Sequence, residues 1–233
     1  NRAKSVVLMN PRPLPLDRFD LVIAPRHDGL PRRSNVVQTL GALAARLSDD
    51  ALLAARSRLL THPRFRLDLG TPLERRQPVI ALFIGGDTAA YALTEPLVDM
   101  LVEQVLAACE TADGWCLVTS SRRTPEPVER LLAERLSRHP RCRLLVLASR
   151  DPLDGTMEGM LGSADVSIVT GESISMVSEA CGSGQRVLVI APVPRGSGLR
   201  GTTKHVRFLR ELAREGYARL VPAAALAQVI QES

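Results

Sequence analysis

The sequence predicts an α/β protein whose parallel β-sheet is covered by helices on both faces. From residue 78 onward, short apolar runs alternate regularly with longer helical segments. Strands that are connected through helices in this way are parallel and lie in one sheet. The runs are continuously apolar, as in residues 79–84, and this pattern indicates strands that are buried on both faces.

Composition narrows the classes of function. The 233 residues are 45% hydrophobic and 24% charged, which is typical of a globular protein with a sizeable core. The net charge is +5, but the basic residues are scattered and only 3% of residues are aromatic, so we expect no nucleic-acid partner. No apolar stretch has the length that a membrane span needs. Four cysteines without metal-ligand spacing indicate reduced thiols and a cytoplasmic location.

The chain divides into two unequal parts. Residues 1–60 are predicted to form the first part, and residues 61–78, which are rich in Pro, Arg and Gly, are predicted to be a linker. Residues 79–233 then form the second part. The expected elements of the first part are strands at 5–9 and 20–24, a strand or a helix at 35–41, and a helix from its N-cap Ser48 to residue 60.

The second part carries the regular alternation of strands and helices. Its helices are marked by prolines or hydroxyl residues at their starts, and its strands by the apolar runs. The expected strands lie at 79–84, 115–119, 143–147, 165–169, 187–190 and 218–221. The expected helices lie at 96–110, 125–138, 156–161, 202–215, from 173 onward, and after Pro222.

Three polar turns follow strands of the second part and should therefore lie together. The C-terminal ends of parallel strands meet at one edge of a sheet. Glycines allow close backbone approach, hydroxyls and arginines donate hydrogen bonds, and a helix N-terminus attracts anions, so the combined turns suit a diphosphate. The turns span residues 85–88, 120–124 and 170–175.

Two carboxylates lie near the last of these turns. Glu172 and Glu179 are two helical turns apart, so we expect them on one helix face, where Glu179 can bind the vicinal hydroxyls of a ribose. Simpler interpretations stay open. They are Ser173 and Ser175 as helix caps, Glu179 as a solvated residue, and Arg122 with Arg123 as a solvated pair.

A second candidate position lies in the first part. His27 and Asp28 directly follow a predicted strand, which is where α/β proteins place reactive side chains. Histidine titrates near neutral pH, so this pair is a candidate general base. The alternative is that Asp28 caps a turn and that His27 is merely exposed.

Four segments carry a resemblance to a known family, namely residues 19–28, 35–41, 121–125 and 170–180. They resemble the mitochondrial-fission "elongated mitochondria" family, whose bacterial members are described as glycosyltransferases. The resemblance extends over nearly the whole chain. Glu172 stands where bacterial members often carry Asp, a difference that keeps the charge.

The second part also resembles the nucleotide-sugar-binding domain of GT-B glycosyltransferases. That resemblance implies that Glu179 holds the ribose and that Gly85 and Gly86 contact the phosphates. It further implies a nucleoside-diphosphate sugar as donor substrate, no cofactor and no metal, since no DxD motif is evident. Together with the polar turns, it gives the predicted nucleotide-sugar-binding residues, which are Gly85, Gly86, Asp87, Thr88, Ser121, Arg122, Arg123, Thr170, Gly171, Glu172, Ser173, Ser175, Met176 and Glu179.

The first part is short for this class of enzyme. GT-B enzymes contain two Rossmann-like domains of similar size. We therefore expect a GT-B-like fold with one complete Rossmann-like domain, preceded by the closing part of a second, acceptor-side domain. The chain would then be either a fragment or a member that lacks half of the cleft.

The favoured function is a metal-independent transfer of a sugar from a nucleoside diphosphate to an unknown acceptor. A glycolipid at the inner face of the membrane is one candidate acceptor, which the basic charge permits. The alternative is a non-catalytic adaptor, like the plant members of the resembled family. A dinucleotide-dependent oxidoreductase is disfavoured, because residues 119–122 lack the acidic residue expected after the second strand.

Overall fold

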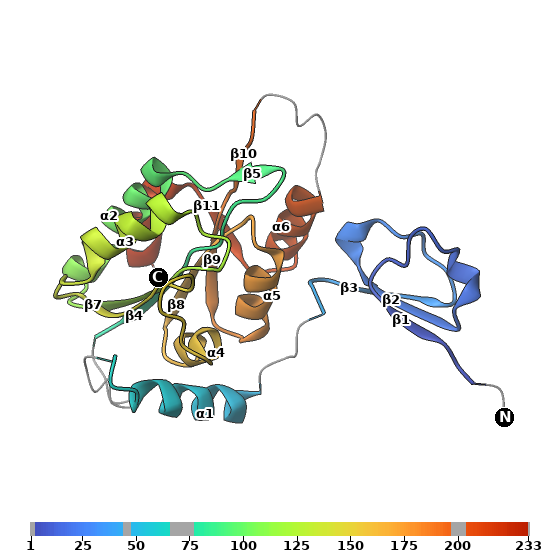
Figure 1. Cartoon of the computed structure of the whole chain (residues 1–233), viewed down its shortest axis with the longest axis horizontal. Helices are drawn as coiled ribbons and strands as arrows, with labels where there is room; N and C mark the ends of the chain where they lie inside the picture. Colours follow the sequence, from blue (N-terminus) through green and yellow to red (C-terminus); the bar gives the residue numbers. More distant parts are fainter. Residues whose placement is uncertain (1–2, 44–47, 66–76, 197–203, 233) are drawn as a thin grey trace.

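The computed structural model describes residues 3–43, 48–65, 77–196 and 204–232, and two parallel sheets organise them (Figure 1). The larger sheet has six parallel strands in the order β11-β9-β8-β4-β6-β7. This is the doubly wound order, in which the direction of strand addition reverses between β4 and β8. The strands are β4 (Val79–Phe83), β6 (Trp115–Thr119), β7 (Cys142–Val146), β8 (Val166–Thr170), β9 (Arg186–Ile190) and β11 (Arg219–Val221).

Helices cover both faces of the larger sheet, as the continuous apolar strands predict. Ile80 and Leu82 of β4 pack on one face, whereas Ala81 and Phe83 pack on the other, because successive side chains of a strand point to opposite faces. One face is covered by α2 (Glu95–Thr111), α3 (Glu126–Leu136) and α7 (Leu226–Gln231), which follows the short helix η3 (Ala223–Ala225). The other is covered by α4 (Thr156–Leu161), α5 (Ile174–Gly182) and α6 (Lys204–Arg214).

The smaller sheet contains three parallel strands in sequential order. Sequential order is that of the closing half of a doubly wound sheet, so the predicted fold class is confirmed for both parts. The segment 35–41, which fitted a strand or a helix, forms a strand. The elements are β1 (Val6–Leu8), η1 (Leu16–Arg18), β2 (Leu21–Pro25), η2 (Arg26–Asp28) and β3 (Val36–Thr39).

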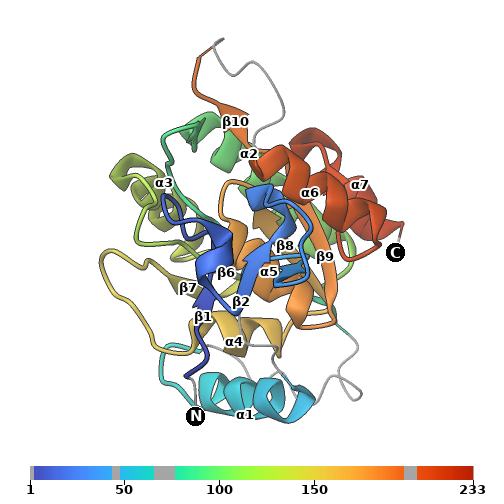
Figure 2. The ribbon, with the colours of Figure 1, turned by 90° about the vertical axis from the view of Figure 1, so that its right-hand side faces the viewer.

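The smaller sheet lies beside α5 and α6 (Figure 1, Figure 2). The parts touch at several points, two of which involve side chains of α5 and α6. The ring of His27 in η2 packs edge-on against Phe208 of α6, and the backbone N–H of Ala42 donates to Ser178 Oγ of α5 at 2.9 Å. The loop that follows β2 therefore faces the larger sheet's helices.

Helix α1 (Asp49–Leu60) begins at its predicted cap, where Ser48 Oγ accepts a hydrogen bond from the Ala51 N–H at 3.2 Å. Its residues Leu52 and Leu59 join the core of the larger sheet, and α1 lies against α4 (Figure 1). We grouped this helix with the first part, but its packing partner lies in the second. Residues 66–76 of the expected linker lie outside the described residues.

One small feature was not predicted. Strands β5 (Tyr91–Ala92) and β10 (Val193–Pro194) pair antiparallel in a two-stranded ribbon at the edge where the polar turns meet. Among the residues that the structure describes, no helix combines the length and the apolar character needed to cross a bilayer.

Candidate functional site

The three predicted polar turns meet at the switch point of the larger sheet. The Gly85 N–H donates to Thr170 Oγ1 at 2.8 Å, and the Asp87 N–H donates to the Arg123 carbonyl at 3.2 Å. Thr124 Oγ1 also donates to the Gly85 carbonyl. A Cβ on Gly86 would lie only 2.2 Å from the carbonyl oxygen of Arg123, so the close approach of these loops requires glycine.

Glu172 lies inside this junction. Its side chain is only 4% exposed, and its Oε1 accepts a hydrogen bond from Thr170 Oγ1 at 2.7 Å. Burial raises the pKa of the Glu172 carboxyl, although the Thr170 hydroxyl and the charge of Arg123 act in the opposite direction. The expectation that Glu172 and Glu179 share a helix face is wrong, because α5 begins two residues after Glu172, at Ile174.

The N-terminus of α5 points into the same edge. Ser173 occupies the N-cap position and is buried, yet its side chain makes no capping hydrogen bond with the described residues. The interpretation of Ser173 as an ordinary cap is therefore not supported. Gly171 and Thr170 form the turn before it, and Ser175 in the first turn of α5 is exposed. An uncapped helix N-terminus is a favourable place for an anion.

A cavity of about 390 Å³ opens beside the junction. It lies between the β6–α3 loop, the β7–α4 loop and α5. Four residues of the predicted set line it: Ser121, Arg122, Met176 and Glu179. Its other lining residues include Val146, Ala148, Leu153, Met157 and Glu158.

Glu179 is the carboxylate of this cavity. Within the described part of the chain it makes no hydrogen bond and no ion pair. Burial raises the pKa of the Glu179 carboxyl, and the nearby negative charge of Glu158 raises it further. A half-buried carboxylate of this kind needs hydrogen-bond donors. Arg122 also lines the cavity, but its side chain is exposed and makes no ion pair with Glu179 in the described part of the chain.

Asp87 and Thr88 hold their own loop in shape. Asp87 Oδ1 accepts from the Leu93 N–H at 2.8 Å, and the other carboxylate oxygen pairs with Arg195. Thr88 Oγ1 accepts from the Tyr91 N–H at 3.0 Å. Both side chains are thus engaged within the protein.

Two residues at this edge were missed by the sequence analysis. Arg195 donates from Nε to the carbonyls of Thr88 and Tyr91, in addition to its pair with Asp87. His205 Nε2 lies 3.1 Å from the Glu172 carbonyl, and its ring packs edge-on against Tyr91. Neither residue belongs to a motif, and both meet their partners only after the chain has folded.

His27 and Asp28 lie on η2, where the smaller sheet meets α6. His27 is 5% exposed and packs edge-on against Phe208 with ring centroids 5.1 Å apart, so the alternative of an exposed histidine is wrong. Its Nε2 lies 3.9 Å from Asp28 Oδ1, and its Nδ1 has no partner among the described residues. Burial lowers the pKa of His27; Asp28 opposes this, and Lys204, His205 and Arg207 reinforce it.

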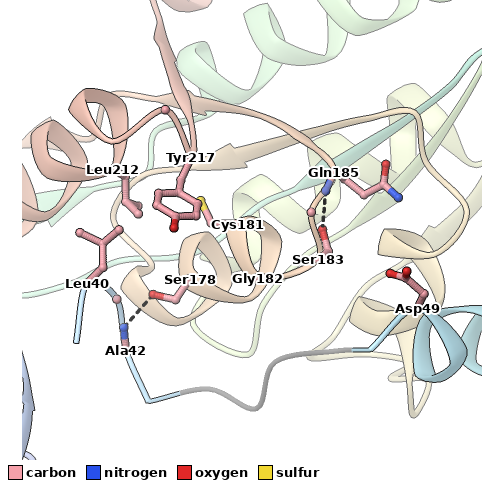
Figure 3. Close-up of a pocket in the computed structure, with 13 residues that line it drawn as sticks. Leu40, Ala42, Asp49, Ser178, Cys181, Gly182, Ser183, Gln185, Leu212 and Tyr217 are labelled. Atoms are coloured by element: carbon pink, nitrogen blue, oxygen red, sulfur yellow. Dashed lines mark hydrogen bonds between the residues drawn. The ribbon is translucent and has the colours of Figure 1, made fainter.

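A larger cavity, of about 680 Å³, lies on another face of α5 (Figure 3). Ser178 and Cys181 of α5, Leu40 and Tyr217 contribute to its lining. None of the predicted site residues lines it. The larger cavity is therefore separate from the junction of the three turns. Across the described ranges, no group of three or more His, Cys, Asp or Glu side chains is arranged to hold a metal ion.

The doubly wound sheet, the sequential parallel sheet that precedes it and the loops gathered at the switch point define a GT-B-like protein. Comparison with known proteins gives the family. The family described as "Mitochondrial fission ELM1" matches residues 1–232, and the chain belongs to it.

A curated relative is the Mitochondrial fission protein ELM1 of Arabidopsis thaliana. It is 29% identical over 207 residues, which cover 75% of this chain and 43% of the relative. The chain thus spans less than half the length of this relative.

Solved structures share the fold. A protein assigned as a UDP-N-acetylglucosamine 2-epimerase in Listeria monocytogenes matches 92% of this chain with 52% of its own length, at a TM-score of 0.55 and 20% identity. S. aureus MnaA, solved with UDP, matches 92% of this chain with 50% of its own length, at a TM-score of 0.52 and 14% identity. The UDP-GlcNAc 2-epimerase of Methanocaldococcus jannaschii matches 92% of this chain with 55% of its own length, at a TM-score of 0.50 and 14% identity.

Proposed function

We propose that this chain contributes the donor-binding part of a GT-B glycosyltransferase and binds a nucleoside-diphosphate sugar in the 390 Å³ cavity and the adjoining junction. The observation that carries the proposal is Glu179. Its carboxylate faces a cavity, has a raised pKa, and finds no donor within the described residues. The vicinal hydroxyls of a ribose supply two donors to such a group.

The diphosphate would lie between the cavity and the junction. The N-terminus of α5 offers backbone N–H groups and the positive end of the helix dipole. Arg122 and Arg123 offer guanidinium groups that bind phosphate oxygens bidentately. Their charges would neutralise the leaving diphosphate, which is the role that a metal ion plays in other transferases. The MnaA structure, which contains UDP, supports this choice of ligand class.

We place the residues that would act on the acceptor on η2, which carries His27 and Asp28. The acceptor hydroxyl oxygen would attack the anomeric carbon, the bond from that carbon to the diphosphate oxygen would break, and the acceptor proton would pass to His27 or Asp28. Burial keeps His27 in its neutral form, which is the form that can accept a proton. The proposed acceptor class is a glycolipid at a membrane surface. Co-sedimentation of the chain with vesicles that contain or lack a glycolipid tests this choice.

Ligand-induced stabilisation tests the proposal. The purified chain is heated with UDP, GDP, CMP, ADP, TDP or NAD, and a ligand at a hundred times its dissociation constant should add about 2.7 kcal/mol to the free energy of unfolding. One nucleoside diphosphate should raise the melting temperature, and Glu179→Ala should abolish the effect. Glu103→Ala, which alters an exposed glutamate of α2, is the matched control and should respond as the wild type does.

A non-catalytic adaptor is the second candidate. It is favoured by membership of the ELM1 family and by the likeness to the Arabidopsis fission protein. An adaptor does not need the Glu179 cavity to bind nucleotides. If no nucleotide stabilises the chain, the transferase proposal fails and the adaptor is favoured; stabilisation by NAD alone would indicate a dinucleotide site instead.

A further inference from the structure

Glu129 is a fully buried carboxylate that the proposed function does not use. It lies in the first turns of α3 and has 0% of its surface exposed. Burying a charged side chain is costly unless hydrogen bonds and opposite charges compensate. The hydrogen-bond partners of Glu129 therefore indicate which part of the structure its carboxylate holds in place.

Those partners come from two different loops. Ser120 Oγ, in the β6–α3 loop, donates to Glu129 Oε1 at 2.6 Å. Ser149, in the β7–α4 loop, donates from its N–H to Oε1 at 3.2 Å and from its hydroxyl to Oε2. Arg150 Nε lies 3.8 Å from Oε2. One side chain thus joins two loops that are distant in sequence.

The charge of Glu129 fixes the direction of these hydrogen bonds. Burial by itself raises the pKa of the Glu129 carboxyl, but hydrogen bonds from Ser120 and Ser149 and the charge of Arg150 outweigh it, and the pKa lies below its ordinary value. An ionised carboxylate only accepts, so both serine hydroxyls must donate to it. The Ser120 oxygen is then free to accept from the Ala148 N–H, which lies 2.8 Å away.

The two loops joined in this way form walls of the 390 Å³ cavity. Ser120, Ser121 and Arg122 line it from the β6–α3 loop. Ala148 and the segment 152–156 line it from the β7–α4 loop. Glu129 itself does not line the cavity. It can affect the cavity only indirectly, by fixing the positions of the loop residues to which it is hydrogen-bonded.

We propose that Glu129 is a positioning residue of the nucleotide cavity. Its ionised carboxylate sets the separation of the β6–α3 and β7–α4 walls and so pre-organises the space opposite Glu179. The part of this inference that concerns nucleotide affinity rests on the proposed function. The part that concerns the walls does not.

Two variants and one control test it. Glu129→Gln keeps the shape of the side chain but turns one acceptor oxygen into a donor. Ser149→Ala keeps the carboxylate and removes one hydroxyl contact, and it remains informative if Glu129→Gln fails to fold. Glu134→Gln, on an exposed position of the same helix, is the matched control.

Hydrogen exchange is measured without ligand, and nucleoside-diphosphate affinity is measured by calorimetry. In both variants the backbone amides at positions 148 and 149 should exchange about tenfold faster, and the affinity should fall about tenfold, the loss expected when one charge-assisted hydrogen bond is broken. Amides of β9, on the far side of the sheet centre, should exchange as in the wild type.

The outcomes are distinct. Exchange at positions 148 and 149 that matches the wild type in both variants would overturn the inference. So would a lowered melting temperature with unchanged nucleotide affinity, because a purely structural role predicts that result. If the wild type itself binds no nucleotide, the proposed function fails, and the exchange data alone decide whether Glu129 positions the walls.

Discussion

Gly86 shows at the residue scale how tightly the polar turns pack. A Cβ added there would meet the backbone of Arg123 at 2.2 Å, and backbone cannot swing aside as a flexible side chain can. We expect Gly86→Ala to lower the free energy of unfolding by about 1–3 kcal/mol, the usual cost of overpacking, and to remove nucleotide-induced stabilisation. Urea denaturation and thermal shift measure the two effects.

Gly182 provides the control for that substitution. A Cβ at Gly182, in the last turn of α5, would meet nothing within 4 Å. Gly182→Ala should therefore be neutral or stabilising by up to about 1 kcal/mol, since alanine is the better helix former. Equal destabilisation by the two substitutions would contradict the close packing assigned to Gly86.

Glu172 yields a prediction about pH. Burial raises the pKa of its carboxyl above the ordinary value of 4.5, so the folded protein binds this proton more tightly than the unfolded chain does. The free energy of unfolding therefore falls as the pH rises from that value through the folded pKa. Glu172→Gln keeps an acceptor for Thr170 and removes the charge.

We expect Glu172→Gln to be more stable than the wild type near neutral pH, by about 1.4 kcal/mol for each unit by which the folded pKa is raised. The difference should vanish at a pH well below 4.5. Urea denaturation at the two pH values measures it. A variant that is less stable than the wild type at neutral pH would show that the ionised carboxylate is well compensated by Arg123 and the backbone.

Helix α1 gives a prediction at the scale of one element. Its N-cap Ser48 accepts the Ala51 N–H, and replacing such a cap by alanine typically costs about 1 kcal/mol. Ser48→Ala should lower the free energy of unfolding by about that amount. Ser57→Ala, within the same helix, is the matched control and should cost less, because serine is not favoured in a helix interior. Denaturant unfolding of the two variants separates these outcomes.

Element boundaries show what local sequence can and cannot predict. Apolar runs predicted every strand of the larger sheet, and the central strands β4 and β8 are buried along their whole length. The β5–β10 ribbon has only two residues in each strand and joins segments far apart in sequence, so no local pattern marks it. The predicted start of α5, residue 173, is one residue before the observed start at Ile174. Glu172 precedes both, so the helical spacing used to place Glu172 on one face with Glu179 did not apply to it.

At the scale of the whole molecule, long-range contacts account for what the sequence analysis missed. Parallel topology was sufficient to predict that the three turns share an edge. It could not predict that Asp87 pairs with Arg195, or that Glu129 joins two loops, since those side chains meet only when separate loops fold together. The burial of His27 likewise depends on how the smaller sheet meets α6.

The contact between the smaller sheet and α6 should be sensitive to pH. His27 is buried there against Phe208, and the charged and titratable groups that face it are Asp28, Lys204, His205 and Arg207. Burial and the three cationic neighbours lower the pKa of His27 below the ordinary value of 6.5. The neutral ring is therefore favoured in the folded state, and the stability that it contributes is present above that value and is lost as the pH falls below it.

His27→Phe tests this directly, because it keeps the aromatic contact with Phe208 and removes the titrating group. The wild type should lose stability between its unfolded pKa and the lower folded one, with a slope of up to about 1.4 kcal/mol per pH unit for one proton. The variant should lose this contribution and retain the one from His205, since burial also lowers the pKa of that ring. Identical slopes in the two proteins would mean that His27 is solvated when it titrates, and hence that the smaller sheet is not held against α6 in solution.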